Sequence, residues 1–399
     1  MSGLLILSIA VIALTSIVIM YACNAFEDAA DYLGRNMKPG VKGATINAIG
    51  SSLPELFTTS LLLFGPFVAP GFFGNGEDSF SAGIATCAGS AVFNAVIIPA
   101  LCIIAVTFFG VRKGKGAPEK VSQVVLDKRV VIKDGFFFVL AELALIFFLG
   151  DQRMAWWMGG VLVLIYVVYI AITLSTGFGV EEEDDDDDED DEDDDEEEGV
   201  GIFGLGWLLD FNNRFYGGAE FTQKSAWVVL SWSILAIAVA CAGIAWAVEH
   251  SAQALGVKPY FTAVILAAAA TSVPDTVLSV KDAVKGEYDD AVANAVGSNI
   301  FDITICLGVP LLIYGLVFGD ISISPAIPGA DNSAADVQVL RWVLLMVTAV
   351  VLSLFLIGKG IGRGKAAILF SLYFMWTAFV VGRAQGAQWA NDIIQWLPA

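Results

Sequence analysis

Long apolar runs separated by short polar stretches repeat along the whole chain. A helix of about 20 apolar residues crosses a hydrocarbon core of ~30 Å, so each run is a candidate membrane span. We place ten spans at residues 4–22, 41–65, 81–109, 134–149, 155–175, 225–248, 259–284, 288–317, 338–357 and 366–383. The fourth is short and contains Glu142, which leaves an earlier start near Val130 open. The continuous runs argue against a β-barrel, whose strands alternate apolar and polar residues.

Composition agrees with an all-α polytopic membrane protein. The 399 residues are 57% hydrophobic and 16% charged, whereas soluble domains carry roughly a quarter charged residues. The net charge of −21 misleads, because 18 consecutive acids, Glu181–Glu198, leave 24 acids against 21 bases elsewhere. We interpret this tract as disordered and solvated, with weak Ca²⁺ attraction as the alternative. It lacks the glycine-containing loop of an EF-hand.

The basic residues predict the orientation of the chain. If the N-terminus is outside, the loops 23–40, 110–133, 176–224, 285–287 and 358–365 face the cytoplasm. Of the 21 Lys and Arg residues, the opposite side then carries only Arg153, Lys258, Arg341 and Arg383. The positive-inside rule therefore favours both termini outside and a cytoplasmic acidic loop. We expect a multi-pass protein of the plasma membrane.

Two related segments carry the candidate chemistry. The first contains GSSLPE at Gly50–Glu55 and GSAVFN at Gly89–Asn94; the second contains ATSVPD at Ala270–Asp275 and GSNIFD at Gly297–Asp302. They start in the second and seventh spans, which are an odd number of spans apart, so the second copy inserts upside down. This predicts two inverted five-helix repeats meeting at a midplane site.

The predicted organisation is therefore a first repeat at 1–175, a cytoplasmic loop at 176–224 and a second repeat at 225–399. A carboxylate at the bilayer centre costs roughly 2.5–3.5 kcal/mol. Glu55, Asp275 and Asp302 have no Lys or Arg nearby in sequence, so a bound cation is a candidate counter-charge.

The other polar residues of the motifs supply further oxygen ligands. Pro54 and Pro274 interrupt helical hydrogen bonding, which predicts broken helices with freed backbone carbonyls. The candidate cation ligands are Glu55, Asp275, Asp302, Asn94, Ser51, Ser52, Ser90, Thr271, Ser272 and Ser298, with the carbonyls of Ala48 and Ala268. An all-oxygen set suits hard cations such as Ca²⁺ and argues against zinc or copper. Each motif alone could mark a kink with a protonated acid, but two matching copies favour a site.

These motifs resemble the signature repeats of the cation/Ca²⁺ exchanger superfamily. The resemblance is strongest to Na⁺/Ca²⁺ exchangers, particularly their K⁺-dependent branch. It implies that Glu55 and Asp275 form the central Ca²⁺ site and that the other candidates line it and the flanking Na⁺ sites. An acid at the position of Asp302 is associated with K⁺ dependence in the animal branch, although some K⁺-independent relatives also have it.

The expected function is Na⁺/Ca²⁺ antiport by alternating access, with K⁺ co-transport left open. H⁺/Ca²⁺ antiport is the alternative in the same class, and a cation channel is the alternative in another. An intramembrane hydrolase is disfavoured, because HExxH and GxSxG motifs are absent from the sequence. We expect a non-enzyme without cofactor, whose partners are Ca²⁺, Na⁺, optionally K⁺ or H⁺, and the lipid bilayer, but not nucleic acid.

Overall fold

The computed structural model describes most of the chain outside its longest loops. The described residues are 2–33, 35, 48–69, 72–73, 79–112, 118–150, 153–175, 215–218, 220–322, 333–358 and 360–394. The predicted acidic tract at 181–198 and most of the predicted loop 176–224 lie outside them.

The described part is mostly helical. Its first half contains α1 (Ser2–Leu33), α3 (Ala48–Val68), α4 (Ser79–Ile104), α5 (Lys128–Leu149) and α6 (Trp156–Ser175). Its second half contains α9 (Gln223–Leu255), α10 (Pro259–Thr262), α11 (Ala268–Thr271), α12 (Val273–Lys285), α13 (Tyr288–Phe301), α14 (Gly308–Phe318), α15 (Ser333–Leu356), α16 (Arg363–Ala384) and α17 (Gln388–Ile394).

The helices are those of a polytopic membrane protein. Among the described residues, 6 helices are long and apolar enough to cross a membrane, and the pair Pro259–Thr271 and Val273–Lys285, bent by 42°, would make 7. A helix or helix pair lies at each predicted span, but with different ends. The chain forms α1 as far as Leu33, eleven residues past the predicted end at 22.

Local capping explains two of these boundaries. The Asp127 side chain accepts a hydrogen bond from the Arg129 backbone N–H at 2.8 Å and begins α5 at Lys128, near the earlier start left open above. Thr222 and Ser225 form a reciprocal capping box at the start of α9. Such caps satisfy the first N–H groups of a helix, which have no partner within the helix.

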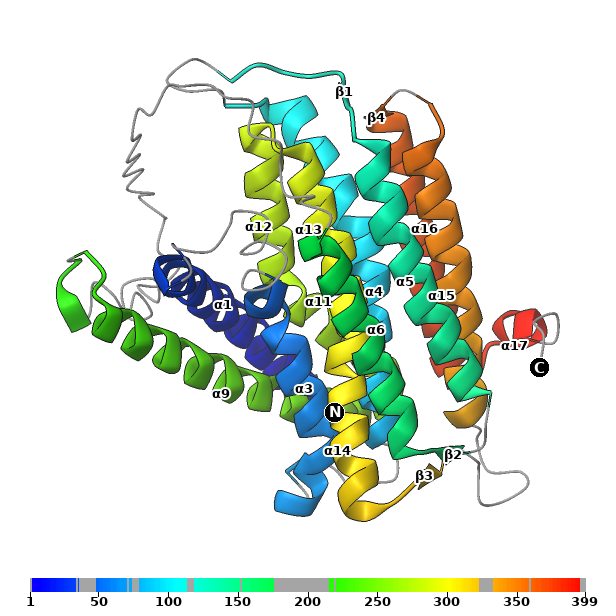
Figure 1. Cartoon of the computed structure of the whole chain (residues 1–399). Helices are drawn as coiled ribbons and strands as arrows, with labels where there is room; N and C mark the ends of the chain where they lie inside the picture. The colour runs from blue at the N-terminus through cyan, green and yellow to red at the C-terminus, as the bar shows by residue number, and fades with distance from the viewer. Residues whose placement is uncertain are drawn as a thin grey trace.

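Helices α1 and α9 form an antiparallel pair that crosses the other helices obliquely (Figure 1). Ala25 and Ala29 of α1 cluster with Ala226 and Val229 of α9. Small side chains let two helix backbones approach closely, which is how membrane helices commonly associate. In α1 only 11% of the most apolar window is buried, against 67% in the span that contains α4. The α1–α9 pair is thus peripheral and α4 is central.

Helix α4 lies between the two halves of the chain. It packs against α3, α11, α12, α13, α15 and α16. A Cβ added to Gly89 would lie 2.3 Å from the Val264 carbonyl oxygen and 2.8 Å from the Ala268 Cβ. Only glycine permits this approach, which brings the neighbouring Ser90 against the second half of the chain.

The two proline motifs have different backbones. Between α11 and α12 the helix breaks at Ser272 (φ −79°, ψ 5°), because Pro274 follows in the first turn of α12 and has no N–H to continue the helix. By contrast, Pro54 lies inside continuous α3. The break predicted at Pro274 is therefore present, and the break predicted at Pro54 is not.

Within the described residues, three π-helical turns lie at Ala105–Phe109, Ala263–Ala267 and Asp302–Cys306. Wider turns of this kind often occur at functional sites. The turn at Asp302 begins at a candidate ligand, whereas Asn94, in the corresponding place of the first motif, lies within regular α4.

In the described part of the chain, two short antiparallel sheets join the halves at opposite ends of the bundle (Figure 1). At one end β1 (Gln123–Val124) pairs with β4 (Ile361–Gly362), and at the other β2 (Arg153–Met154) pairs with β3 (Ile321–Ser322).

Candidate cation site

The three candidate carboxylates converge in the interior of the bundle. Glu55 projects from α3, Asp275 from the first turn of α12, and Asp302 from the π-helical turn after α13. All three are 0% exposed. Within the described part of the chain, none of them pairs with a Lys or Arg side chain. Buried charges are normally paired or bound to a metal, so these acids need a cation or protons.

Ser90 of α4 connects the acids. Its hydroxyl lies 3.2 Å from Glu55 Oε1, 2.8 Å from Asp302 Oδ2 and 2.9 Å from Ser272 Oγ. It also accepts a longer hydrogen bond from Asn94 Nδ2 at 3.4 Å. One hydroxyl from the first motif therefore contacts both an acid of its own half and two residues of the other half.

Asp275 is held by residues of both halves. Asn94 Nδ2 donates to its Oδ2 at 3.0 Å, and Ser298 Oγ donates to its Oδ1 at 2.9 Å. Ser51 also forms a hydrogen bond to this carboxylate. The i, i+4 spacings of 90 with 94 and of 298 with 302 place each pair on one helix face, as the sequence predicted.

Several buried oxygens at the site lack hydrogen-bond partners. Among the described residues these are Glu55 Oε2, Asn94 Oδ1 and Ser52 Oγ. Nearly all buried polar atoms in proteins are paired, so unpaired oxygens that gather beside carboxylates fit a cation site. The described residues contain no group of three or more His, Cys, Asp or Glu side chains placed to hold a metal. A cation here would therefore depend on hydroxyl and amide oxygens as well as carboxylates.

The Ala268 carbonyl does not match the expectation that the proline frees it to bind a cation. The Ala268 carbonyl accepts hydrogen bonds from the Ser272 N–H at 3.1 Å and from Thr271 Oγ1 at 3.3 Å, so it is not freed by the helix break. A proline leaves unpaired the carbonyl four residues earlier, which for Pro274 is that of Ala270. Ala48 is the first described residue of α3.

Sequence reasoning overlooked Asn299. This residue follows Ser298 on α13, is 0% exposed, and has no partner for either amide atom within the described residues. Its place inside the GSNIFD motif was the available signal. The thiol of Cys306 also contacts Asp302 Oδ1, at 3.7 Å.

Glu142 is buried but belongs to a different place. Thr348 of α15 donates to its Oε1 at 2.5 Å, and its Oε2 has no partner in the described structure. No hydrogen bond links Glu142 to the three clustered acids within the described residues. One carboxylate oxygen of Glu142 is therefore bonded to a neighbouring helix, and the residue lies outside the candidate cation site.

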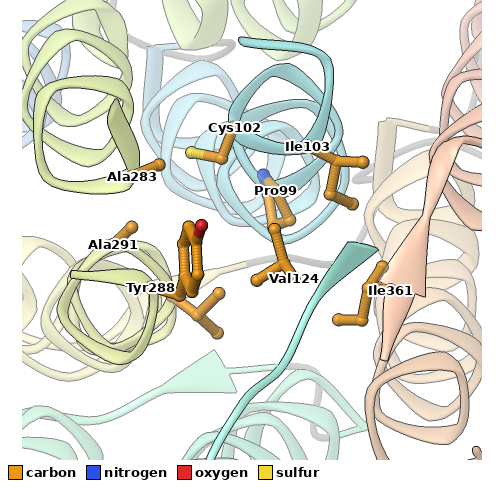
Figure 2. Close-up of a pocket in the computed structure, with 9 residues that line it drawn as sticks. Pro99, Cys102, Ile103, Val124, Ala283, Tyr288, Ala291 and Ile361 are labelled. Atoms are coloured by element: carbon orange, nitrogen blue, oxygen red, sulfur yellow. The ribbon is translucent and has the colours of Figure 1, made fainter. Parts of the chain in front are cut away.

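An apolar cavity lies near the site helices but apart from the ligands. It occupies about 260 Å³ including its open mouth and is lined by Pro99, Cys102, Ile103, Val124, Ala283, Tyr288, Ala291, Val292 and Ile361. Figure 2 shows Val124 and Ile361 opposite Ala283 and Ala291 across this space. None of the candidate ligands lines it, so it is not the cation site.

A protein-family model and several known proteins match this chain in sequence. The family model described as sodium/calcium exchanger protein matches residues 7–175 and 225–382. Sodium/potassium/calcium exchanger 3 of Homo sapiens is 36% identical over 137 residues, 34% of this chain and 17% of that protein. Sodium/potassium/calcium exchanger Nckx30C of Drosophila melanogaster is 33% identical over 146 residues, 37% of this chain and 16% of that protein. The chain thus aligns with under a fifth of the length of these relatives.

Solved structures share the fold over nearly the whole chain. The sodium-calcium exchanger NCX_Mj soaked with 10 mM Na⁺ and 10 mM Sr²⁺ superposes with a TM-score of 0.52 at 20% identity, covering 94% of this chain and 98% of that one. The H⁺/Ca²⁺ exchanger CAX superposes with a TM-score of 0.59 at 13% identity, covering 97% and 91%. With the family match extending over most of both halves, the chain belongs to the sodium/calcium exchanger protein family.

Proposed function

We propose that the protein is a secondary active antiporter that exchanges Na⁺ for Ca²⁺ across a membrane by alternating access. The observation that carries this proposal is the cluster of three buried carboxylates without a cationic partner among the described residues, beside unpaired oxygens of Glu55, Asn94 and Ser52. Ca²⁺ takes six to eight oxygen ligands in flexible geometry, and a mixed set of carboxylates, hydroxyls and amides suits it.

Within this proposal, Glu55 and Asp275 form the central Ca²⁺ site. The residues that line it and the adjacent Na⁺ sites are Ser51, Ser52, Ser90, Asn94, Thr271, Ser272, Ser298 and Asp302. The Ala48 carbonyl is a further oxygen, and the Ala268 carbonyl becomes one only when it gives up its hydrogen bonds from Ser272 and Thr271. Asn299, the neighbour of Ser298 in sequence, is a further candidate amide ligand, because both polar atoms of its side chain are buried without partners among the described residues. The transported ions are Ca²⁺ and Na⁺, with K⁺ as the additional ion to test.

The proposed architecture is ten membrane spans in two inverted repeats, 1–175 and 225–399, separated by the loop 176–224. Two observations support it. The turn between α12 and α13 lies at the opposite end of the bundle from the end of α3 (Figure 1), and residues of the two motifs contact one another, Ser90 with Asp302 and Asn94 with Asp275. The basic residues favour both termini outside and a cytoplasmic acidic loop. The plasma membrane is the location we propose.

The charge of the carboxylates explains why the transport of Na⁺ is coupled to that of Ca²⁺. An empty site exposes uncompensated carboxylates to a low-dielectric interior when the helices move, which is costly. One Ca²⁺ or several Na⁺ ions neutralise them and lower that cost. A ligand shifts a conformational equilibrium only by its differential interaction with the two states. The protein therefore switches between its access states when it holds either one Ca²⁺ or several Na⁺ ions, and it switches slowly when it is empty. Because the empty protein rarely switches, one ion must be exchanged for the other.

Ion-swap flux in proteoliposomes tests the function. An imposed Na⁺ gradient is expected to drive radiolabelled Ca²⁺ uptake, and the same vesicles are assayed with and without K⁺ and with a pH gradient in place of Na⁺. Uptake driven by the pH gradient alone would identify H⁺/Ca²⁺ antiport instead, and single-channel currents would identify a channel. Glu55→Gln and Asp275→Asn should abolish uptake; undiminished uptake in either variant would overturn the assigned site.

A further inference from the structure

The ligand-bearing faces of α12 and α13 continue beyond the site. Ser279 lies four residues after Asp275 and Asn294 lies four residues before Ser298, so both are one helical turn from a ligand on the same face. Asn294 Nδ2 donates to Ser279 Oγ at 2.9 Å and, more weakly, to the Asp275 backbone carbonyl at 3.4 Å. A hydroxyl and an amide are thus joined directly beside the buried carboxylate.

Two acids extend this line toward the α12–α13 turn. Asp282 lies seven residues after Asp275 and Asp290 lies four residues before Asn294, and the two carboxylates interact electrostatically. Exposure falls in order from the turn inward: Asp290 is exposed, Asp282 and Asn294 are half-buried, and Ser279 is buried. We call these four residues the polar ladder.

The neighbouring face of the same helix pair is apolar. Ala283 and Ala291, each next in sequence to a ladder acid, face the cavity of Figure 2. The four ladder residues therefore follow one side of the helix pair, beside this apolar face. Lys281 and Lys285 also interact with Asp282 and offset part of its charge.

The corresponding positions of the first motif form no such ladder. Counted from Glu55 and Ser90, they are Thr59, Leu62, Thr86 and Ala82, with exposures of 1%, 2%, 0% and 0%. The Thr59 hydroxyl contacts Cys87 Sγ at 3.0 Å and the Thr86 hydroxyl donates to the Ala82 carbonyl at 2.9 Å. Both hydroxyls are satisfied locally, and apolar residues stand where the ladder has acids.

We propose that the polar ladder is the route by which the transported cation reaches the site from the side of the α12–α13 turn. The acids attract a hydrated Ca²⁺ or Na⁺ ion, and the Asn294–Ser279 pair supplies oxygens that replace part of its water before it meets Asp275. The corresponding positions on the side of the first motif, Thr59, Leu62, Thr86 and Ala82, are all buried and offer no acid to a cation. This inference rests on the proposed function, because it names the access path to the proposed site.

Sided flux measurements test the route. In vesicles of known orientation, Asn294→Ala should raise the apparent KM for Ca²⁺ presented from the side of the α12–α13 turn by about fivefold to tenfold, the size expected for losing one hydrogen-bonding group. The KM from the opposite side should not change, and Asn294→Ser, which keeps a polar oxygen, should recover most of the loss. Thr86→Ala is the matched control and should alter neither value. Equal KM changes on both sides, or no change in Asn294→Ala, would overturn the proposal.

Thiol labelling provides a readout that does not depend on transport. The native cysteines Cys23, Cys87, Cys102, Cys241 and Cys306 are all buried, so the unmodified protein is the background. A charged methanethiosulfonate should label Asn294→Cys and Asp282→Cys from the turn side, more slowly when Ca²⁺ is present, and should leave Thr86→Cys unlabelled. Equal labelling of Thr86→Cys, or no protection by Ca²⁺, would refute the route. If the wild-type protein shows no Na⁺-driven Ca²⁺ flux but the labelling and its protection by Ca²⁺ are as expected, the proposed exchange is refuted and the proposed route is not.

Discussion

Removing the Ser90 hydroxyl should weaken Ca²⁺ binding more than any other single loss of a hydroxyl at the site. Its oxygen contacts Glu55 at 3.2 Å, Asp302 at 2.8 Å and Ser272 at 2.9 Å. A hydroxyl has one proton, so these contacts share a single donation and their energies do not add. When the site holds a cation, the Ser90 oxygen faces that ion, and a polar contact to a charged group contributes about 1.5–3 kcal/mol, which converts to about a 10-fold to 150-fold loss of affinity for Ser90→Ala.

The pseudo-equivalent serine supplies a matched control. Ser298 donates to Asp275 at 2.9 Å, but Asp275 keeps the hydrogen bond from Asn94 at 3.0 Å when Ser298 is truncated. Ser298→Ala should therefore weaken binding less than Ser90→Ala. Equilibrium binding of radiolabelled Ca²⁺ to the purified protein measures both, with thermal melting to confirm that each variant folds. An effect of Ser298→Ala equal to or larger than that of Ser90→Ala would refute the reasoning.

Three further substitutions test other parts of the structure. Asp302→Asn should reduce K⁺ stimulation of Na⁺-driven Ca²⁺ uptake while leaving uptake itself measurable, and K⁺ stimulation equal to wild type would remove Asp302 from K⁺ selection. Gly89→Ala should lower the melting temperature, because its Cβ would lie 2.3 Å from a carbonyl oxygen and overpacking costs roughly 1–3 kcal/mol, whereas Gly160→Ala, with no atom within 4 Å, should not. Glu142→Gln should melt like the wild-type protein, because the amide oxygen still accepts from Thr348; a large drop would mean that the carboxyl group itself is required.

The two proline motifs show how far sequence reasoning reached. Both predict a helix break, yet only the second breaks, at Ser272, while Pro54 is absorbed within α3. A proline removes one hydrogen bond in either context, but whether the helix then bends depends on what packs around it. Packing is a property of the folded bundle and cannot be read from either motif alone.

Asn299 illustrates the same limit. Its place inside the GSNIFD motif makes it a candidate, but one step along a helix from Ser298 rotates the side chain by about 100°, so position alone does not distinguish a ligand from a packing residue. Only the folded structure shows that both polar atoms of the Asn299 side chain are buried without hydrogen-bond partners among the described residues, which marks it as a candidate ligand.

The sequence by itself determined that the chain is a helical membrane protein with two related acidic motifs. It did so because apolar length and the i, i+4 spacing are local properties that any helix must express. The tertiary structure alone decided which oxygens meet, joining Ser90 to Asp302 and Asn94 to Asp275 across the two halves. It also decided which oxygens remain unpaired and which motif continues into a polar ladder. These depend on the close approach of helices far apart in sequence, such as α4 at Gly89 against Val264, which no local pattern specifies.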